Sequence, residues 1–244
     1  MKGQFKAELL KIRSTRTTIG LVLGMIALIL LFSLLSGLLT EAPNLVSAED
    51  QRGVLSVGSL AGVFSALAGI MLITSEYRYG TIRPTFLFTP RRSRVLAAKL
   101  AAGLLAGLVF GIVAEGLGFA VGYAALTGRG IHLVLNGNQI ALLLLGTIAG
   151  TALWGAIGVG LGAIVRSQVA GIIGLLAWGF VAENLLFAFV PSVGRFAPAH
   201  ASDALIGLTT DHLLHATAGG LMLIAWTAAL ALVGATIAAR RDVN

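Results

Sequence analysis

The chain alternates long apolar runs with short polar stretches. A helix rises about 1.5 Å per residue, so crossing the hydrocarbon core takes about 20 predominantly apolar residues. Six runs meet this length, and we expect transmembrane helices at about 18–40, 54–75, 97–126, 140–165, 168–190 and 217–239. The pattern predicts an all-α membrane protein in which residues 1–244 form a single transmembrane domain.

The composition agrees with this fold class. The chain is 57% hydrophobic and only 11% charged, whereas soluble domains average about 25% charged residues. It has no cysteine, which excludes disulfides and thiolate chemistry. The net charge of +7 does not point to nucleic acid as a partner, because the basic residues gather at the ends of apolar runs.

The basic residues also predict the orientation in the membrane. Most of the 17 lysines and arginines precede the first run, separate the second from the third, or follow the fourth and sixth, whereas Arg52, Arg129 and Arg195 fall on the other side. Cytoplasmic loops of membrane proteins are enriched in Lys and Arg, so we expect a multi-pass plasma-membrane protein with both termini cytoplasmic. The first run is longer than the apolar core of a signal peptide, about 7–15 residues, so we expect it to be retained.

Residues 1–17 predict a short N-terminal helix. Phe5, Leu9 and Ile12 are spaced i, i+4, i+7 and form one apolar stripe with the basic residues off it. We expect an interfacial helix with its apolar side among the lipid headgroups and its lysines toward anionic lipid. An unfolded basic tail is the alternative for so short a segment.

The longest polar interruption is SEYRYGTIRPTFLFTPRRSRVLAAKL, residues 75–100. Gly80 breaks the preceding helix, and Thr81 is a favourable N-cap for a short helix over residues 82–89. Ile82 and Phe86 share one face of that helix. An apolar face on the cytoplasmic side predicts a partner or contact with the membrane surface.

This segment resembles the loop between the second and third spans of the type-2 ATP-binding-cassette exporter permeases. The residues that carry the resemblance are Glu76, Gly80, Thr81, Ile82, Arg83, Leu87, Pro90, Ser93, Arg94 and Lys99. The six spans, the N-terminal helix and a proline-rich, helical external segment between the fifth and sixth spans extend it over the whole chain. Pro84 departs from the pattern, where the family more often has an ordinary helix former.

The resemblance implies a permease subunit of an ATP-driven exporter that works by alternating access. Two such subunits pair, as a homodimer or a heterodimer, and each docks a short coupling helix on a separate ATPase subunit. The residues expected to couple to the ATPase are Glu76, Gly80, Thr81, Ile82, Arg83, Phe86, Leu87, Pro90, Arg92, Arg94, Lys99 and Arg166. None of the four lysines follows a glycine, as a phosphate-binding loop requires, so ATP and Mg²⁺ are expected on the partner and this chain is not expected to be an enzyme.

The resemblance also implies that the second and fifth spans of two protomers enclose the substrate pathway. In this chain the expected lining residues are Ser56, Ser59, Ser65, Trp178, Glu183, Asn184 and Phe187. No acidic cluster or basic pocket is evident within the spans, which favours an amphipathic or apolar substrate such as a drug, a lipid or a peptide antibiotic.

Two acids, Glu115 and Glu183, lie within spans, roughly 25 Å from the cytoplasmic edge. Acids inside a membrane are functional candidates by default. The alternatives are that each reaches the outer interface or pairs with Arg129 or Arg195.

Two further sequence patterns are less specific. Glycines recur at four-residue spacing, for which we expect close helix packing within one protomer: Gly103, Gly107 and Gly111, then Gly118 and Gly122, Gly146 and Gly150, and Gly158 and Gly162. His212 and His215 have a spacing that can ligate a metal, but no third ligand is evident, so we expect no metal site.

Three other classes of membrane protein agree less well with the sequence. A proton-coupled secondary transporter would use Glu115 and Glu183, but it predicts inverted repeats, and no clear internal repeat is visible. A substrate-binding membrane subunit of a vitamin importer and a membrane scaffold would both leave the ordered loop from Glu76 to Lys99 unexplained. The permease interpretation is therefore favoured.

Overall fold

The computed structural model describes residues 2–81, 92–209 and 211–240, and every regular element in these ranges is helical. This confirms the predicted all-α class. The elements are α1 (Lys2–Ser14), α2 (Arg16–Leu39), η1 (Ala42–Leu45), α3 (Ala48–Leu55), η2 (Val57–Leu60), α4 (Ala61–Arg78), α6 (Arg92–Gly128), α7 (Gly137–Val165), α8 (Gln168–Ala177), the π-helical turn η3 (Trp178–Ala182), α9 (Glu183–Phe189), α10 (Pro191–Gly194), α11 (Pro198–Leu205) and α12 (Ala216–Arg240).

Six helical stretches in the described part of the chain are long and apolar enough to cross a membrane. They are Arg16–Leu39, Val57–Arg78, Ser93–Gly128, Gly137–Val165, Gln168–Phe189 and Ala216–Ile237. Each coincides with one of the six predicted runs, with ends that differ by a few residues, and the six apolar helices are thereby confirmed. The largest difference is at the third span, which has 36 residues because its helix already begins among the basic residues before the apolar run.

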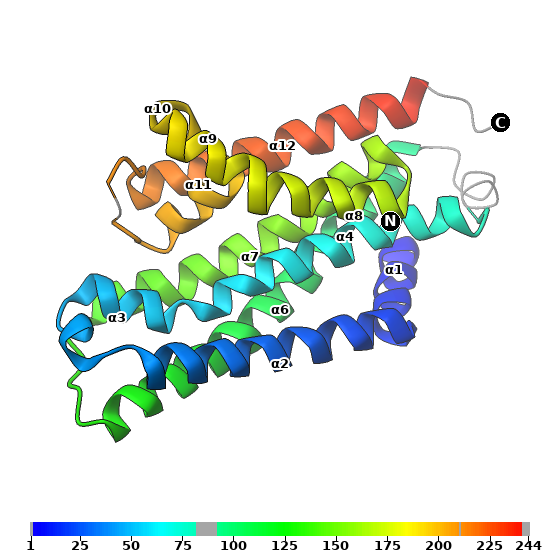
Figure 1. Cartoon of the computed structure of the whole chain (residues 1–244). Helices are drawn as coiled ribbons and strands as arrows, with labels where there is room; N and C mark the ends of the chain where they lie inside the picture. Colours follow the sequence, from blue (N-terminus) through cyan, green and yellow to red (C-terminus); the bar gives the residue numbers. More distant parts are fainter. Residues whose placement is uncertain (1, 82–91, 210, 241–244) are drawn as a thin grey trace.

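The long helices lie side by side in an elongated bundle (Figure 1). One end holds α1, the end of α4 and the start of α6, together with both chain termini; we call it the basic end, because Arg78, Arg94 and Arg166 lie there. The opposite end holds α3, α10 and α11, and we call it the far end. The predicted coupling helix, residues 82–89, lies outside the described residues, whereas the helices on both sides of it, α4 and α6, are described.

Helix α7 occupies the centre of the bundle and packs against α4, α6 and α12. Glycines allow these helices to come very close. A Cβ atom added to Gly155 would collide with the backbone carbonyl of Gly103, and one added to Gly158 would collide with the backbone of Ala66. These contacts confirm that the glycines at four-residue spacing pack helices within one protomer.

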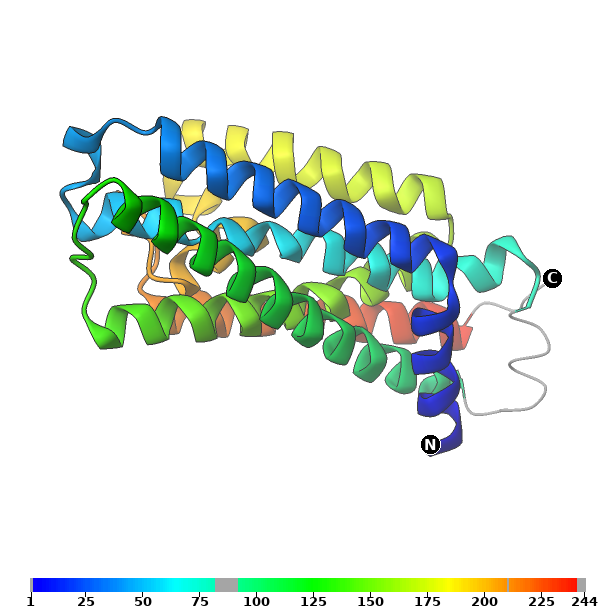
Figure 2. The same cartoon turned by 90° about the horizontal axis from the view of Figure 1, so that it is seen from below.

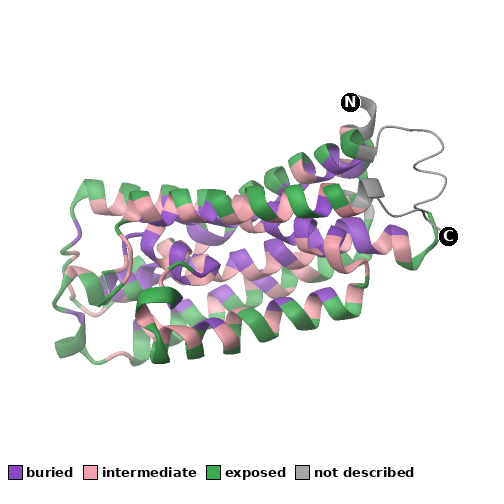
Figure 3. Ribbon diagram, turned by 90° about the horizontal axis from the view of Figure 1, so that it is seen from above, coloured by how far each residue is buried: buried purple, intermediate pink, exposed green. Residues whose placement is uncertain are grey.

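The outer helices bury far less of their surface. Figure 3 shows buried residues concentrated in the middle of the bundle and exposed ones along its outside. In the second and third spans 56% of the most apolar stretch is buried, against 17% in the first and 11% in both the fifth and the sixth. The first, fifth and sixth spans therefore present most of their apolar surface to their surroundings, which in a membrane is lipid or another protein.

Helix α1 lies across the basic end, crosswise to α2 (Figure 2). Its apolar stripe of Phe5, Leu9 and Ile12 is present as predicted, but it packs against the cluster around Leu72 and Leu96 on the second and third spans. The stripe is partly buried, so the bundle covers part of the apolar surface that was expected to lie among lipid headgroups. The position of α1 at a membrane interface stays a prediction.

One buried glutamine holds the loops of the far end together. The Gln51 side chain is fully buried; its Nε2 donates to the carbonyls of Leu45 (3.1 Å) and His132 (2.8 Å), and its Oε1 accepts from the Val134 amide (2.8 Å). Beside it, Arg52 is also buried, and its guanidinium donates to the Gly207 carbonyl. Hydrogen bonds from Gln51 and Arg52 therefore join the connections between spans to one another at this end.

Candidate functional site

Four charged side chains meet at the basic end, and Lys99 is at their centre. Lys99, on the third span, is completely buried. Its ammonium donates to both carboxylate oxygens of Glu8 at 3.0 Å, to Oε1 of Glu76 at 2.8 Å and to the Leu72 carbonyl at 3.0 Å. All three protons of a lysine ammonium are thereby engaged.

Lys11 completes this charge network, defined as Glu8, Lys11, Glu76 and Lys99. Its ammonium lies 2.5 Å from Oε1 of Glu76 and 3.3 Å from Oε1 of Glu8. Burial would lower the pKa of Lys11, but the hydrogen bond that Lys11 donates to Glu76 and the charges of Glu8 and Glu76 outweigh it, so the net effect raises the pKa. The network thus pairs two basic side chains with two acidic ones.

The network joins three elements that are far apart in sequence. Glu8 and Lys11 lie on α1, Glu76 lies in the last turn of α4, and Lys99 lies near the start of α6. Removing one partner from a buried pair leaves an uncompensated charge, at a cost of about 3–5 kcal/mol. The network therefore ties both helices that flank residues 82–91 to each other and to α1.

The structure brings together two of the predicted coupling residues, Glu76 and Lys99, but the partners of Glu76 differ from those suggested by the sequence. A negative charge at a helix C-terminus is unfavourable, so the sequence predicts a compensating group, either Arg78, Arg83 or Arg94 or the backbone N–H groups that follow Gly80. Within the described residues, the cations that approach Glu76 are Lys11 and Lys99. Glu76 is only 3% exposed, so it is not a solvated surface acid.

The other predicted coupling residues lie around this network or outside the described chain. Gly80 has a φ of +68° after α4, Thr81 is exposed beside it, and Arg94 is exposed near the start of α6. Arg166 ends α7 in the left-handed region; its Nη2 donates to the Ile237 carbonyl at 3.0 Å, and its guanidinium lies 5.5 Å from the centre of the Tyr77 ring. The predicted residues Ile82, Arg83, Phe86, Leu87 and Pro90 lie outside the described residues, as does the side chain of Arg92.

Sequence reasoning missed Glu8 as a member of the site. A signal was present, because Glu8 is the only acid in an otherwise basic N-terminal segment and stands three residues before Lys11. Its partner, however, is Lys99, which is 91 positions away. No local pattern identifies such a pair.

The residues predicted to line a pathway do not gather in one cavity of a single protomer. Ser59 borders a small cavity with Thr147 and Ser202. Ser65 is buried against Gly107 and Gly155, and Ser56 bonds the Gly53 carbonyl at 3.2 Å.

Trp178 borders a different, apolar cavity of about 320 Å³, which also contacts Trp154 and Trp226. This cavity lies between the fourth, fifth and sixth spans, with Pro198 at the start of α11 beside it. All three tryptophans of the chain therefore meet at one place. No polar side chain lines it among the described residues, so it suits an apolar group.

The fifth span is interrupted at this level by the π-helical turn η3. Such turns are rare and are frequent at functional sites. Asn184 stabilises this one, because its Nδ2 donates to the carbonyls of Gly179 and Phe180, both at 3.2 Å.

Just after this turn, the carboxylate of the buried Glu183 accepts from the Ala199 amide at 2.7 Å, which anchors the first turn of α11. Phe187 stacks on His200, with ring centres 4.2 Å apart. The fifth span and α11 are thereby joined at two points. The predicted residues Glu183 and Phe187 thus hold α11 in place.

Glu115 is fully buried on the third span, directly against the backbone of Gly58. Neither carboxyl oxygen lies within hydrogen-bond distance of a partner among the described residues, although the Thr147 hydroxyl is near enough to interact with the carboxyl group. The alternatives in which Arg129 or Arg195 pairs with a span carboxylate are not observed: Arg129 donates to the Gly37 carbonyl at 2.7 Å, and the Arg195 guanidinium lies over the Phe196 ring.

The two histidines with metal-ligand spacing lie in a non-helical stretch, so the spacing does not place them on one helical face. Within the described residues, no group of three or more His, Cys, Asp or Glu side chains could hold a metal ion.

Comparison with known proteins gives no family assignment, because no protein-family model matches the chain and no curated protein matches it. The resemblance to the type-2 permeases therefore rests on the residues of the polar loop and on the order of the spans.

Proposed function

We propose that the chain is the transmembrane permease subunit of an ATP-driven exporter, with its basic end in the cytoplasm and the ATPase on a separate chain. The observation that carries the proposal is the charge network of Glu8, Lys11, Glu76 and Lys99. It clamps both helices that lead into residues 82–91, the segment proposed to dock on the ATPase. A polar loop that only connected two spans would need no buried clamp at its base.

The network gives the proposed mechanism a physical basis. When the ATPase dimer closes, it pushes on the short helix over residues 82–89. Because Glu76 and Lys99 join α4 to α6, the two spans move together instead of absorbing the push as a local bend. A rigid element of this kind transmits a two-state change from one protein to another, and the spans switch between inward-facing and outward-facing arrangements.

The exposed fifth and sixth spans support pairing with a second permease subunit, and the apolar cavity beside Trp178 supports an apolar or amphipathic substrate. A cavity lined by apolar side chains cannot recognise a hydrophilic substrate by hydrogen bonds. Drugs, lipids and apolar peptides remain the substrate classes that fit.

Docking is tested by co-purification with a candidate ATP-binding-cassette ATPase co-expressed with this chain. The double variant Ile82→Asp and Phe86→Asp should lose the complex, because a buried unpaired charge costs several kcal/mol. The matched control is Val46→Asp and Val134→Asp, which places two carboxylates on exposed apolar residues at the far end. Equal co-purification of both double variants would refute docking through this helix.

Transmission is tested in proteoliposomes that contain both subunits. Glu76→Gln should lower substrate-stimulated ATP hydrolysis more than it lowers assembly, because the amide keeps the shape of the side chain but weakens the pairs with Lys11 and Lys99. A variant with an unchanged ratio of hydrolysis to assembly would remove Glu76 from the coupling path.

A second candidate, a proton-coupled transporter, is favoured by the two buried span acids Glu115 and Glu183. It predicts substrate uptake driven by a pH gradient in proteoliposomes of this chain alone, without ATP or a partner. Glu115→Gln and Glu183→Gln would then abolish transport. Transport that requires the ATPase and ATP instead favours the exporter.

A further inference from the structure

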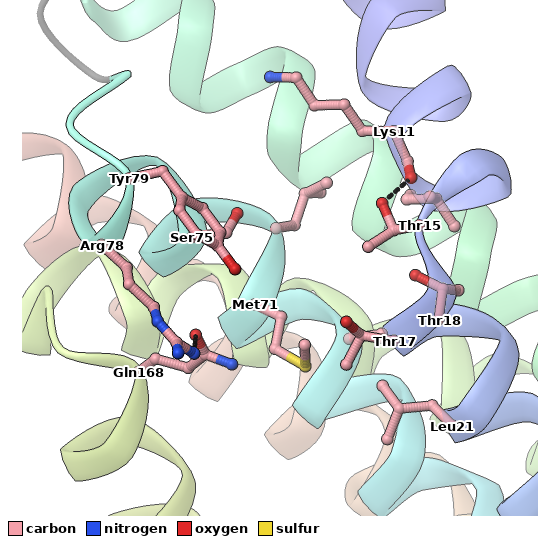
Figure 4. Close-up of a pocket in the computed structure, with 13 residues that line it drawn as sticks. Lys11, Thr15, Thr17, Thr18, Leu21, Met71, Ser75, Arg78, Tyr79 and Gln168 are labelled. Atoms are coloured by element: carbon pink, nitrogen blue, oxygen red, sulfur yellow. Dashed lines mark hydrogen bonds between the residues drawn. The ribbon is translucent and has the colours of Figure 1, made fainter.

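A cavity of about 150 Å³ opens at the basic end between α2, α4 and the first residue of α8. Figure 4 shows Ser75 and Arg78 of α4, with Tyr79 directly after it, on one side and Thr17 of α2 on the other. At about 30 Å³ per water, the volume corresponds to roughly five waters, enough for a compact polar group. The charge network borders this cavity through Lys11 but does not fill it.

Among the described residues that line the cavity, Arg78 carries a positive charge and no acid is present to balance it. The Arg78 guanidinium donates to Oε1 of Gln168 at 3.3 Å and lies 5.6 Å from the centre of the Tyr79 ring. No ion pair within the described part of the chain involves Arg78. Lys11 lies at the rim, but its ammonium points away from α2 (Figure 4) and is compensated by Glu8 and Glu76. The cavity therefore favours a single negative charge beside Arg78.

The lining changes from polar to apolar along both helices in the same direction. On α4 it passes from Arg78 and Ser75 to Met71, and on α2 it passes from Thr18 to Leu21. Both changes run from the basic end into the membrane span. A dissolved anion would need only the polar part, whereas a phospholipid presents a charged phosphate followed by an acyl chain in this order.

We propose that this cavity binds an anionic phospholipid of the cytoplasmic leaflet. The headgroup phosphate lies between Arg78 and the hydroxyls of Ser75, Thr17 and Thr18, and the start of an acyl chain lies on Leu21, Ala68 and Met71. Arginine binds phosphate oxygens through parallel N–H donors. The cytoplasmic leaflet is rich in anionic lipid, which attracts basic residues at span ends. Binding is independent of any ATPase, and so it goes beyond the proposed transport function.

The test is native mass spectrometry of the delipidated protein in detergent, with phosphatidylglycerol, phosphatidylcholine of the same acyl chains, or soluble glycerol phosphate. The wild type should retain phosphatidylglycerol in preference to the other two. Arg78→Gln should weaken retention about five- to tenfold, because one cation near an anionic lipid contributes about 1 kcal/mol. Ser75→Leu, which blocks the cavity without changing its charge, should weaken it as much. Arg78→Lys should restore most of it.

The matched control is Arg94→Gln, which removes an exposed arginine at the same end but outside the cavity and should leave retention unchanged. Helix content by circular dichroism confirms that each variant is folded. Retention by Arg78→Gln and Ser75→Leu at the wild-type level would overturn the site. Equal retention of phosphatidylcholine would show an apolar cleft without headgroup recognition, and equal binding of glycerol phosphate would show an anion site without lipid specificity; either result overturns the proposal.

Discussion

Buried carboxyl groups at the basic end and in the far half of the molecule are treated in opposite ways. At the basic end, Glu8 and Glu76 share two lysines. Farther along the bundle, Glu183 accepts one backbone hydrogen bond and Glu115 accepts none from the described residues. All four are buried. Burial alone therefore does not tell what an acidic side chain does in this protein. The role of each acid follows from the groups that it contacts.

The difference suggests that the buried acids of the two regions have different roles. Two lysines and two acids join α1, α4 and α6 through directional hydrogen bonds, as the proposed coupling to an ATPase would need. A carboxyl without fixed partners stabilises little, and its retention in a span points to function. Substitutions that remove one acid or base at a time test this contrast.

The largest expected effect is on Lys99. Lys99→Met keeps the length of the side chain but leaves Glu8 and Glu76 buried with only Lys11 between them. We expect a loss of about 3–5 kcal/mol of unfolding free energy, measured by denaturation in detergent. Arg94→Met, five positions earlier on the same helix and exposed, is the control and should change stability by less than about 0.5 kcal/mol. Similar losses for both variants would contradict a special role of the network.

The sequence could predict the spans but not this joint. Apolar runs of sufficient length leave little choice other than membrane helices, so all six spans were predictable to within a few residues. The polar loop singled out Glu76 and Lys99. The partner acid Glu8, in contrast, depends on how α1 crosses the bundle, and that is decided by Phe5, Leu9 and Ile12 packing on α4 and α6.

The far-end half was also only partly predictable. The fifth span read as one continuous apolar run, and nothing in its composition showed the π-helical turn over Trp178–Ala182. Asn184 was singled out as a pathway residue, and its contacts show that it bonds the carbonyls of that turn. The meeting of three tryptophans depends on contacts between separate spans, which a single sequence does not reveal.

The next largest effect is expected at Glu183. Glu183→Leu removes the acceptor of the Ala199 amide and leaves that N–H buried without a partner. The expected loss is about 1–3 kcal/mol, with faster hydrogen exchange in α11. Glu41→Leu, an exposed acid of the far-end loops, should leave both quantities unchanged. Unaltered exchange in α11 would mean that Glu183 does not hold this segment.

A smaller effect is expected from pH, through His200 of α11. The hydrogen bond to Asp203 is the main cause that raises the pKa of His200, and Glu183 adds to it, while burial opposes them. A raised folded-state pKa means that the His200–Asp203 pair stabilises fully below the unfolded value of about 6.5 and that this stabilisation is lost as pH rises through the folded value. Because Asp203 is 41% exposed at its side chain, the effect should stay below about 1 kcal/mol.

The measurement for His200 is the difference in unfolding free energy between the wild type and Asp203→Asn as pH is raised. The difference should be largest in mildly acidic buffer and should vanish in alkaline buffer. A difference that grows with pH has the wrong sign for a raised pKa and would contradict the ion pair.

The smallest effect on stability is expected at Glu115, and it gives the sharpest contrast with Lys99. No partner among the described residues lies within hydrogen-bond distance of the Glu115 carboxyl, and only the Thr147 hydroxyl is near enough to interact with it. Glu115→Leu, which has a similar shape, therefore breaks no hydrogen bond of ordinary length. Replacement of an unpaired buried polar group by an apolar one is close to neutral or stabilising, so we expect a change of less than about 1 kcal/mol in unfolding free energy. If transport in proteoliposomes is lost while stability stays, Glu115 acts on the substrate or on protons. A loss of stability as large as that of Lys99→Met would instead show that Glu115 has a structural partner in the assembled protein, and the contrast between the two halves would fail.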